Sequence, residues 1–139
     1  MKRTYIDANL LIAAFQGDED TSRRALGVLD DPGRTLVVSD YVRLEVLPKP
    51  TFHKRREEIE FMRSVLDQAE NVPSSSELTG KSLDLAAIYD MTPLDALHIG
   101  AAAVSGVDEL VTMEKPTKPM CRVKELKVIS LHSELRNAR

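Results

Sequence analysis

The sequence has little of what marks several large classes of protein. It contains one cysteine, Cys121, so no disulfide can form within the chain. One cysteine and three scattered histidines also do not supply the ligand spacing of a zinc site. Tryptophan is absent, and three tyrosines and three phenylalanines are too few to favour a platform on which nucleic-acid bases stack.

A surplus of positive charge is missing as well. Nineteen Lys and Arg residues stand against 22 Asp and Glu residues, which gives a net charge of -3. Any binding of phosphate groups must therefore be local or depend on metal ions. The apolar stretch near the first residue is short and is interrupted by Asp7, so it predicts neither a signal peptide nor a membrane-spanning helix. We expect a cytoplasmic protein with no membrane contact.

The sequence does contain an alternation of strand-like and helix-like segments. Its 139 residues, with 42% hydrophobic and 29% charged residues, are typical of one globular domain over 1–139. Apolar and β-branched runs predict strands at 4–7, 35–39, 109–113 and 126–131. Helices are predicted at 9–15, 21–31, 40–50, 53–70, 78–89 and 92–106, with a loop at 71–77. Two prolines are expected to end the helix at 40–50. This order predicts a three-layer α/β/α fold with a mostly parallel central sheet.

Acidic residues occur where these predicted elements meet. Asp7 ends the first strand, Glu45 lies in the helix after the second strand, Asp95 lies in the first turn of the helix at 92–106, and Glu114 follows "LVTM". Ligands of parallel sheets bind beyond the carboxyl ends of the strands, so we expect these four carboxylates to share one pocket. Such a group needs cations to offset its repulsion, and oxygen ligands suit Mg²⁺ or Mn²⁺. Divalent ions held by carboxylates are typical of phosphodiester hydrolysis.

Each acid also has a simpler interpretation. Asp7 is well placed to cap the helix that follows it. Asp95 and the threonine three residues before it match a capping box. Glu45 and Glu114 could be solvated surface residues, and His98 is more typical of a buried histidine than of a metal ligand. The joint placement of the acids favours a common site over four separate explanations.

Three segments resemble the blocks of the PIN domain family, and in particular the VapC-type toxins of toxin–antitoxin pairs. They are "TYIDANLLIAAF", "SDYVRLEV" and "TPLDALHIGAAAVSGVDELVTME", and the resemblance extends over about residues 4–131. It implies a metal-dependent endoribonuclease that uses Mg²⁺ or Mn²⁺. The acids matched to the family's positions are Asp7, Glu45, Asp95 and Glu114, where the last stands in place of the usual Asp. Asn9 and Thr112 match the supporting amide and hydroxyl. We expect His98 to support the site as well.

The same resemblance implies two kinds of protein partner and an RNA substrate. An antitoxin segment would bind along the predicted helices at 40–47 and 53–70, and family members are commonly homodimers. Basic side chains that could contact RNA are those of Arg43, Lys54, Arg55, Arg56, Lys115, Lys118 and Arg122. For the basic segment at 53–57, a solvated helix face is the simpler interpretation.

Other functions remain open at this point. The glutamate at position 114 is compatible with a PIN-like domain of weakened catalysis that acts by binding a partner protein or RNA. Cleavage of structured DNA would use the same residues. A receiver-like phosphoacceptor domain is disfavoured, because it needs paired acids after the first strand, where Asp7 has no acidic neighbour.

Overall fold

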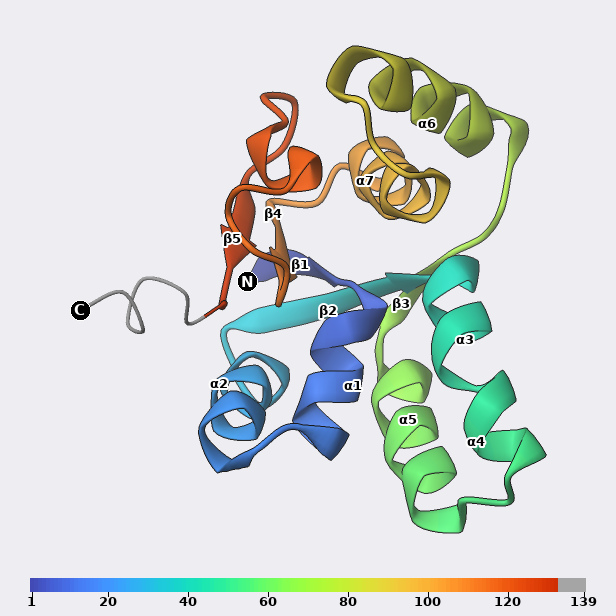
Figure 1. The fold of residues 1–139 in the computed structure, drawn as a ribbon, viewed down its shortest axis with the longest axis vertical. Coiled ribbons are helices and arrows are strands. Elements are labelled where there is room, and N and C mark those ends of the chain that lie inside the picture. Colours follow the sequence, from blue (N-terminus) through green and yellow to red (C-terminus); the bar gives the residue numbers. More distant parts are fainter. Residues whose placement is uncertain (133–139) are drawn as a thin grey trace.

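The strands form one parallel sheet between two layers of helices (Figure 1). The computed structural model describes residues 1–132, so the last seven residues of the expected domain lie outside the described residues. The strands are β1 (Lys2–Ile6), β2 (Arg34–Ser39), β3 (Glu70–Val72), β4 (Glu109–Thr112) and β5 (Val128–Ser130). Their order is β3-β2-β1-β4-β5 and every pairing is parallel. The predicted α/β/α class is therefore confirmed.

The helices cover both faces of this sheet. They are α1 (Ala8–Gln16), α2 (Glu19–Leu29), α3 (Asp40–Val46), α4 (Pro48–Phe52), α5 (Arg56–Gln68), α6 (Ser76–Tyr89) and α7 (Pro93–Ser105), with a 3₁₀ turn at Pro119–Arg122. In Figure 1, α6 and α7 lie above the sheet, while α1, α2 and α5 lie below it. Within the described residues, no helix has the length and apolar character needed to span a bilayer.

Burial on both faces explains the strand sequences. The central strands β1, β2 and β4 are apolar in consecutive positions, as expected for a sheet covered on both sides. Fully buried side chains of these strands are Tyr5, Ile6, Val37, Val38, Leu110 and Val111. Because the strands are parallel, their carboxyl ends meet at one edge, where Asp7, Ser39 and Thr112 stand at or just beyond the strand ends. This edge is where polar side chains can gather.

The helix ends follow the signals in the sequence. The hydroxyl of Ser75 accepts a hydrogen bond from the backbone N–H of Leu78, so this serine caps α6. Pro93 opens α7, and Gly106 ends it in the left-handed region with φ 66°. The resulting position of α7 brings its first turn to the carboxyl edge of the sheet.

Three parts of the predicted secondary structure are wrong. The helix predicted at 53–70 is shorter in the structure, because α5 begins only at Arg56. Lys54, two residues earlier, has a positive φ of 54°. Residues 70–72, which are predicted as a helix end and a loop, form β3 and pair with β2. Because this segment has only three residues and is mostly polar, its sequence does not reveal the pairing.

The two prolines do not end the helical segment predicted at 40–50. Pro48 follows the end of α3 but opens α4, because a first helical residue needs no backbone N–H, and Pro50 lies within α4.

Candidate active site

A small polar cavity at the carboxyl edge of the sheet brings the four predicted acids together. Its volume is about 110 Å³. It is lined by Asp7, Ala8, Asn9, Glu45, Leu94, Asp95, His98 and Glu114. These residues come from the end of β1, from α1, α3 and α7, and from the segment after β4. The acids are up to 107 residues apart in sequence (114 − 7), and only the fold places them in one cavity.

Asp7 is the most deeply buried of these acids, with 3% of its surface exposed. One carboxylate oxygen accepts the backbone N–H of Leu10 at 3.3 Å, and the other accepts the hydroxyl of Thr112 at 2.6 Å. Burial raises the pKa of Asp7 to about 7, although the hydrogen bond from Thr112 acts to lower it. Asp7 therefore caps α1 and also lines the cavity, where its charge is costly unless a cation is near.

Asn9 connects the first helix to the acid after β4. Its side-chain amide donates to Glu114 at 2.9 Å, and its carbonyl oxygen accepts the backbone N–H of Met113 at 3.2 Å. The backbone N–H of Glu114 in turn donates to the hydroxyl of Thr112 at 3.1 Å. Lys118 lies 3.9 Å from the second carboxylate oxygen of Glu114. Asn9 and Thr112 thus hold the glutamate against the cavity.

Glu45, on α3, is held by a histidine on α7. Its carboxylate lies 2.5 Å from Nε2 of His98, which is 3% exposed. Nδ1 of the same ring lies 2.8 Å from the hydroxyl of Tyr5, and that hydroxyl lies 2.7 Å from Oγ of Ser39. Sequence reasoning missed Tyr5 and Ser39, because in a buried strand both have the pattern of core residues.

Asp95 does not form the capping box that its spacing suggested. Thr92, the N-cap residue immediately before α7, makes no capping hydrogen bond through its side chain. Asp95 is only half-buried and lines the cavity. The geometry therefore leaves its carboxylate facing the same cavity as Asp7, Glu45 and Glu114.

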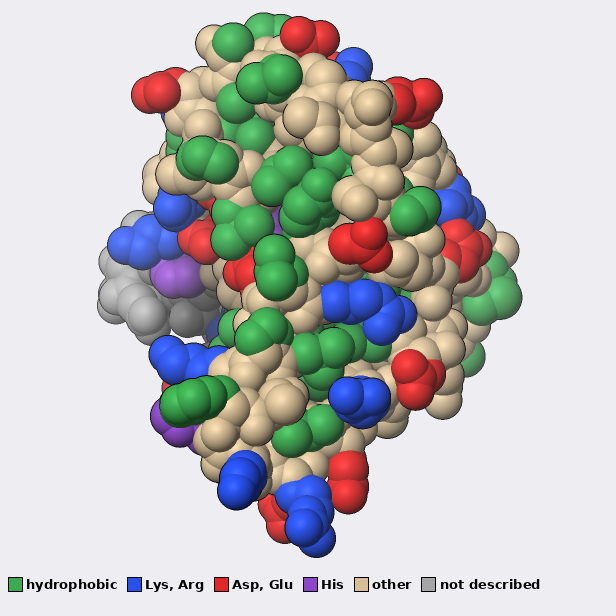
Figure 2. All heavy atoms as spheres, turned by 90° about the vertical axis from the view of Figure 1, so that its right-hand side faces the viewer, with side chains coloured by type: hydrophobic (Ala, Val, Ile, Leu, Met, Phe, Trp, Pro, Cys, Tyr) green, Lys and Arg blue, Asp and Glu red, His purple; other side chains and the backbone are tan. Residues whose placement is uncertain are grey.

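The predicted basic residues do not line the cavity. Lys54, Arg55 and Arg56 are exposed where α5 begins. Figure 2 shows several Lys and Arg side chains toward the lower end of one face, the end at which α4 and α5 lie in Figure 1. Arg43 donates instead to the side chain of Asn71 and to the backbone carbonyl of Leu66. Of the basic candidates, Lys118 has a contact with a cavity acid.

The donor chemistry of the cavity fits a hard divalent cation. Its polar atoms are mainly carboxylate and amide oxygens, the ligands that Mg²⁺ and Mn²⁺ prefer. Burial, together with the nearby charges of Glu114, Asp7 and Asp95, raises the pKa of Cys121 to about 11, and this thiol is not among the residues that line the cavity. Among residues 1–132, however, no three His, Cys, Asp or Glu side chains are already arranged as a metal cluster.

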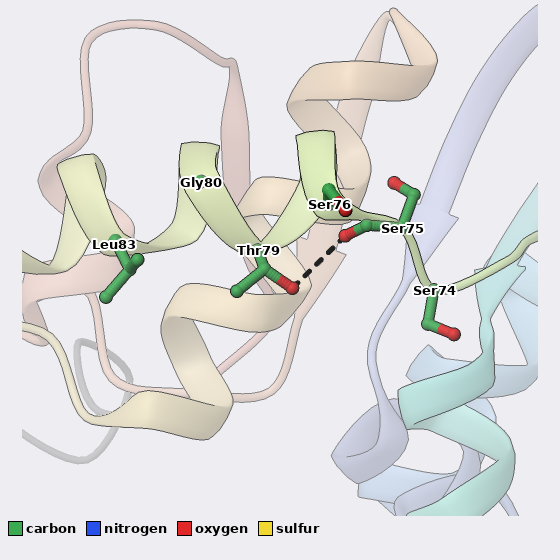
Figure 3. Close-up of a pocket in the computed structure, with 6 residues that line it drawn as sticks. All are labelled: Ser74, Ser75, Ser76, Thr79, Gly80 and Leu83. Carbon is green, nitrogen blue, oxygen red and sulfur yellow. Dashed lines mark hydrogen bonds between the residues drawn. The ribbon is translucent and has the colours of Figure 1, made fainter.

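A larger cavity of about 540 Å³ lies at the start of α6 (Figure 3). It is lined by Ser74, Ser75, Ser76, Thr79, Gly80 and Leu83. The hydroxyl of Thr79 there donates to the backbone carbonyl of Ser75 at 3.1 Å. With hydroxyls and no acid or base among its lining residues, this cavity offers no group for hydrolysis, and the smaller acidic cavity remains the candidate active site.

A known protein family matches most of this chain. The model of the PIN domain family matches residues 4–117. The search of curated proteins gave no match.

Solved structures share the fold at low sequence identity. VapBC2 from Rickettsia felis, bound to a DNA fragment from its promoter, aligns with a TM-score of 0.70 and 16% identity, over 92% of this chain and 98% of that chain. A toxin–antitoxin complex from Klebsiella pneumoniae aligns with a TM-score of 0.68 and 22% identity, over 91% and 96%. VapC20 from Mycobacterium tuberculosis, a toxin that cleaves the sarcin–ricin loop, aligns with a TM-score of 0.60 and 13% identity, over 89% and 98%.

Proposed function

The chain belongs to the PIN domain family, and we propose that it is a divalent-metal-dependent endoribonuclease that acts as the toxin of a toxin–antitoxin pair. The observation that carries this proposal is the convergence of Asp7, Glu45, Asp95 and Glu114 in one cavity of about 110 Å³. Four carboxylates without a Lys or Arg among the lining residues repel one another, and a cation with phosphate ligands would relieve that repulsion.

Each cavity residue has a proposed role. Asp7 and Asp95 hold Mg²⁺ or Mn²⁺, with Glu45 and Glu114 binding directly or through water. When bound, the ion supplies charge stabilisation to the phosphate and lowers the pKa of water. Glu45, fixed by His98, orients the attacking water in line with the 3′ oxygen, so that cleavage leaves a 5′-phosphate and a 3′-hydroxyl. Asn9 and Thr112 keep the carboxylates in place.

The solved neighbours support one of the two partner assignments. Two of the similar structures contain toxin–antitoxin assemblies, which supports an antitoxin partner for this chain. We also propose a homodimer, which the resemblance to the family implies. Exposed apolar side chains are available on the helices after β2, since Leu44 is 66% and Phe52 is 80% exposed. We place the antitoxin there, along α3, α4 and α5. Lys115 and Lys118, next to Glu114, and the basic start of α5 are proposed contacts for RNA.

The activity is tested with purified protein, an RNA pool, and Mn²⁺, Mg²⁺ or EDTA. We expect cleavage with either ion, no cleavage in EDTA, and loss of cleavage in the Asp7→Asn variant. Asp84→Asn is the matched control, because Asp84 is an exposed carboxylate on α6 that does not line the cavity. Equal cleavage by the wild type and Asp7→Asn would contradict the proposal, since it would indicate a contaminating nuclease.

A second function is supported by the hydrogen bonds already made in the cavity. Oxygens of Glu45 and Glu114 are bound by His98 and Asn9, an arrangement compatible with a domain that binds a partner or RNA without cleaving it. RNA binding in a gel-shift assay without cleavage in any of the metal conditions would favour this function over the nuclease.

A further inference from the structure

A chain of four buried or half-buried side chains runs from the core to the cavity. Oγ of Ser39 lies 2.7 Å from the hydroxyl of Tyr5, which lies 2.8 Å from Nδ1 of His98, while Nε2 of His98 lies 2.5 Å from Glu45. Tyr5 and Ser39 are fully buried. The four residues come from β2, β1, α7 and α3, so the chain joins two neighbouring strands to two helices.

The direction of the hydrogen bonds follows from the first member. Oγ of Ser39 already accepts the backbone N–H groups of Tyr41 and Val42, because this serine caps α3. Its own hydrogen is therefore the one available for Tyr5, and the hydroxyl of Tyr5 is left to donate to His98. In the opposite direction, Ser39 would accept a third hydrogen and its own would have no acceptor in the core.

The hydrogen bonds of His98 to Tyr5 and Glu45 then have one possible direction. Since Nδ1 of His98 accepts from Tyr5, the ring proton lies on Nε2, where it is donated to Glu45. The chain also closes on itself, because Ser39 caps the helix that carries Glu45. One carboxylate oxygen of Glu45 is bound by the ring, and the other is left for the cavity.

We propose that Tyr5 and Ser39 are positioning residues of the active site, which hold the His98 ring with its proton on Nε2 and so fix the Glu45 carboxylate. Neither residue lines the cavity, and both act through His98. The hydrogen-bond chain is a property of the folded protein by itself. Its consequence for RNA cleavage rests on the proposed nuclease function.

The tautomer is measured by nitrogen-15 NMR of the histidine rings in the metal-free protein. The signals of His98 are identified by their absence from the His98→Gln variant, which separates them from those of His53 and His132. We expect a protonated Nε2 and a hydrogen-bonded, unprotonated Nδ1. In Tyr5→Phe, which keeps the aromatic ring, the Nδ1 signal should move toward that of a nitrogen without a donor.

The positioning role is measured by cleavage rate and by the affinity for Mn²⁺. Tyr5→Phe should lower one or both by about tenfold, the usual effect of losing a residue that orients a metal ligand. The matched control is Tyr89→Phe, because the hydroxyl of Tyr89 donates to exposed Glu125 outside the cavity. Adding Tyr5→Phe to His98→Gln should cost clearly less than tenfold, because Tyr5 acts through the ring.

The outcomes separate this inference from the proposed function. A protonated Nδ1 in the wild type, or unchanged His98 signals in Tyr5→Phe, would overturn the chain whether or not the protein cleaves RNA. The expected signals in a protein that neither cleaves RNA nor binds Mn²⁺ would keep the chain and overturn both its positioning role and the nuclease. Equal cleavage and Mn²⁺ affinity in Tyr5→Phe and Tyr89→Phe would overturn the positioning role alone.

Discussion

The two edges of the sheet both bury carboxylates, but their surroundings differ. At the amino edge, fully buried Glu109 accepts hydrogen bonds from Arg34 at 2.9 Å and Thr4 at 2.7 Å, and Lys2 lies 3.6 Å away. At the carboxyl edge, Asp7 is almost as buried, yet within residues 1–132 it has no ion pair with Lys or Arg.

The difference in surroundings changes the pKa values of Glu109 and Asp7 in opposite directions. Burial acts to raise the pKa of Glu109, but the hydrogen bonds from Thr4 and Arg34 outweigh it and hold the pKa below its ordinary value. Burial dominates at Asp7 and raises its pKa to about 7. The protein thus neutralises one edge with its own cations, whereas the other edge needs a proton or an external cation.

The largest expected effect is the loss of activity at the carboxyl edge. Asp95→Asn removes a proposed metal ligand without changing the size of the side chain, and we expect RNA cleavage to fall by about a thousandfold, or about 4 kcal/mol of transition-state stabilisation. Cleavage rates with saturating Mn²⁺ measure this loss. Asp84→Asn should retain full activity, and a fall of less than threefold in Asp95→Asn would argue against Asp95 as a ligand.

Next in size is the loss of a cation at the amino edge. Arg34→Met leaves Glu109 buried beside Lys2 alone, and we expect the free energy of unfolding to fall by about 3 kcal/mol. Urea unfolding measures this change, with Arg23→Met as a control because Arg23 is exposed on α2. The folded fraction of Arg34→Met should still cleave RNA. A stability change below about 0.5 kcal/mol would mean that Arg34 does not compensate Glu109.

The opposite sign is expected for the buried acid of the other edge. The pKa of Asp7 is higher in the folded protein than the ordinary 3.8, so the folded state binds the proton more tightly and stability falls as pH rises from about 4 to above 7. Asp7→Asn should remove this loss. In EDTA at pH above 7, we expect the variant to be more stable than the wild type by about 2 kcal/mol.

The comparison is then repeated with metal. Above the dissociation constant, Mn²⁺ should stabilise the wild type with the logarithm of its concentration, and it should have little effect on Asp7→Asn. Thermal unfolding across pH 5 to 8, with EDTA or Mn²⁺, measures both effects. A variant less stable than the wild type in EDTA at every pH would show that the cap at Leu10 outweighs the charge of Asp7.

The smallest expected effect concerns the acid whose identity departs from the family pattern. Glu114→Gln keeps an oxygen for Asn9 but removes the charge, and we expect about a tenfold loss of cleavage, or about 1.4 kcal/mol. Rates measured across Mn²⁺ concentrations show whether added metal restores activity. A loss as large as that of Asp95→Asn would make Glu114 an equal member of the site.

Local sequence patterns were sufficient for most of the fold. The buried strand before Asp7 and the proline and glycine that bound α7 predict elements that the structure contains. The prediction was wrong for β3, because three residues with a Glu and an Asn have no strand pattern of their own. Pairing with β2 makes this segment a strand, and that pairing depends on residues about 30 positions away.

The sequence by itself determined which chemical groups the protein has at its strand ends. Three features could be predicted from the sequence, because each depends only on residues close together along the chain. They are the acids at positions 7, 45, 95 and 114, the parallel α/β order, and the shortage of cysteine and aromatic residues.

Only the tertiary structure decided how these groups are held. It joined Glu45 to His98, His98 to Tyr5, Asn9 to Glu114, and Arg34 to Glu109, pairs separated by 53 to 105 residues. Hydrogen bonds and ion pairs form between atoms a few ångströms apart in space. The number of residues between two partners does not give their distance in space once the chain crosses the sheet. For the same reason, the difference between a neutralised and an uncompensated carboxylate became visible only in the folded protein.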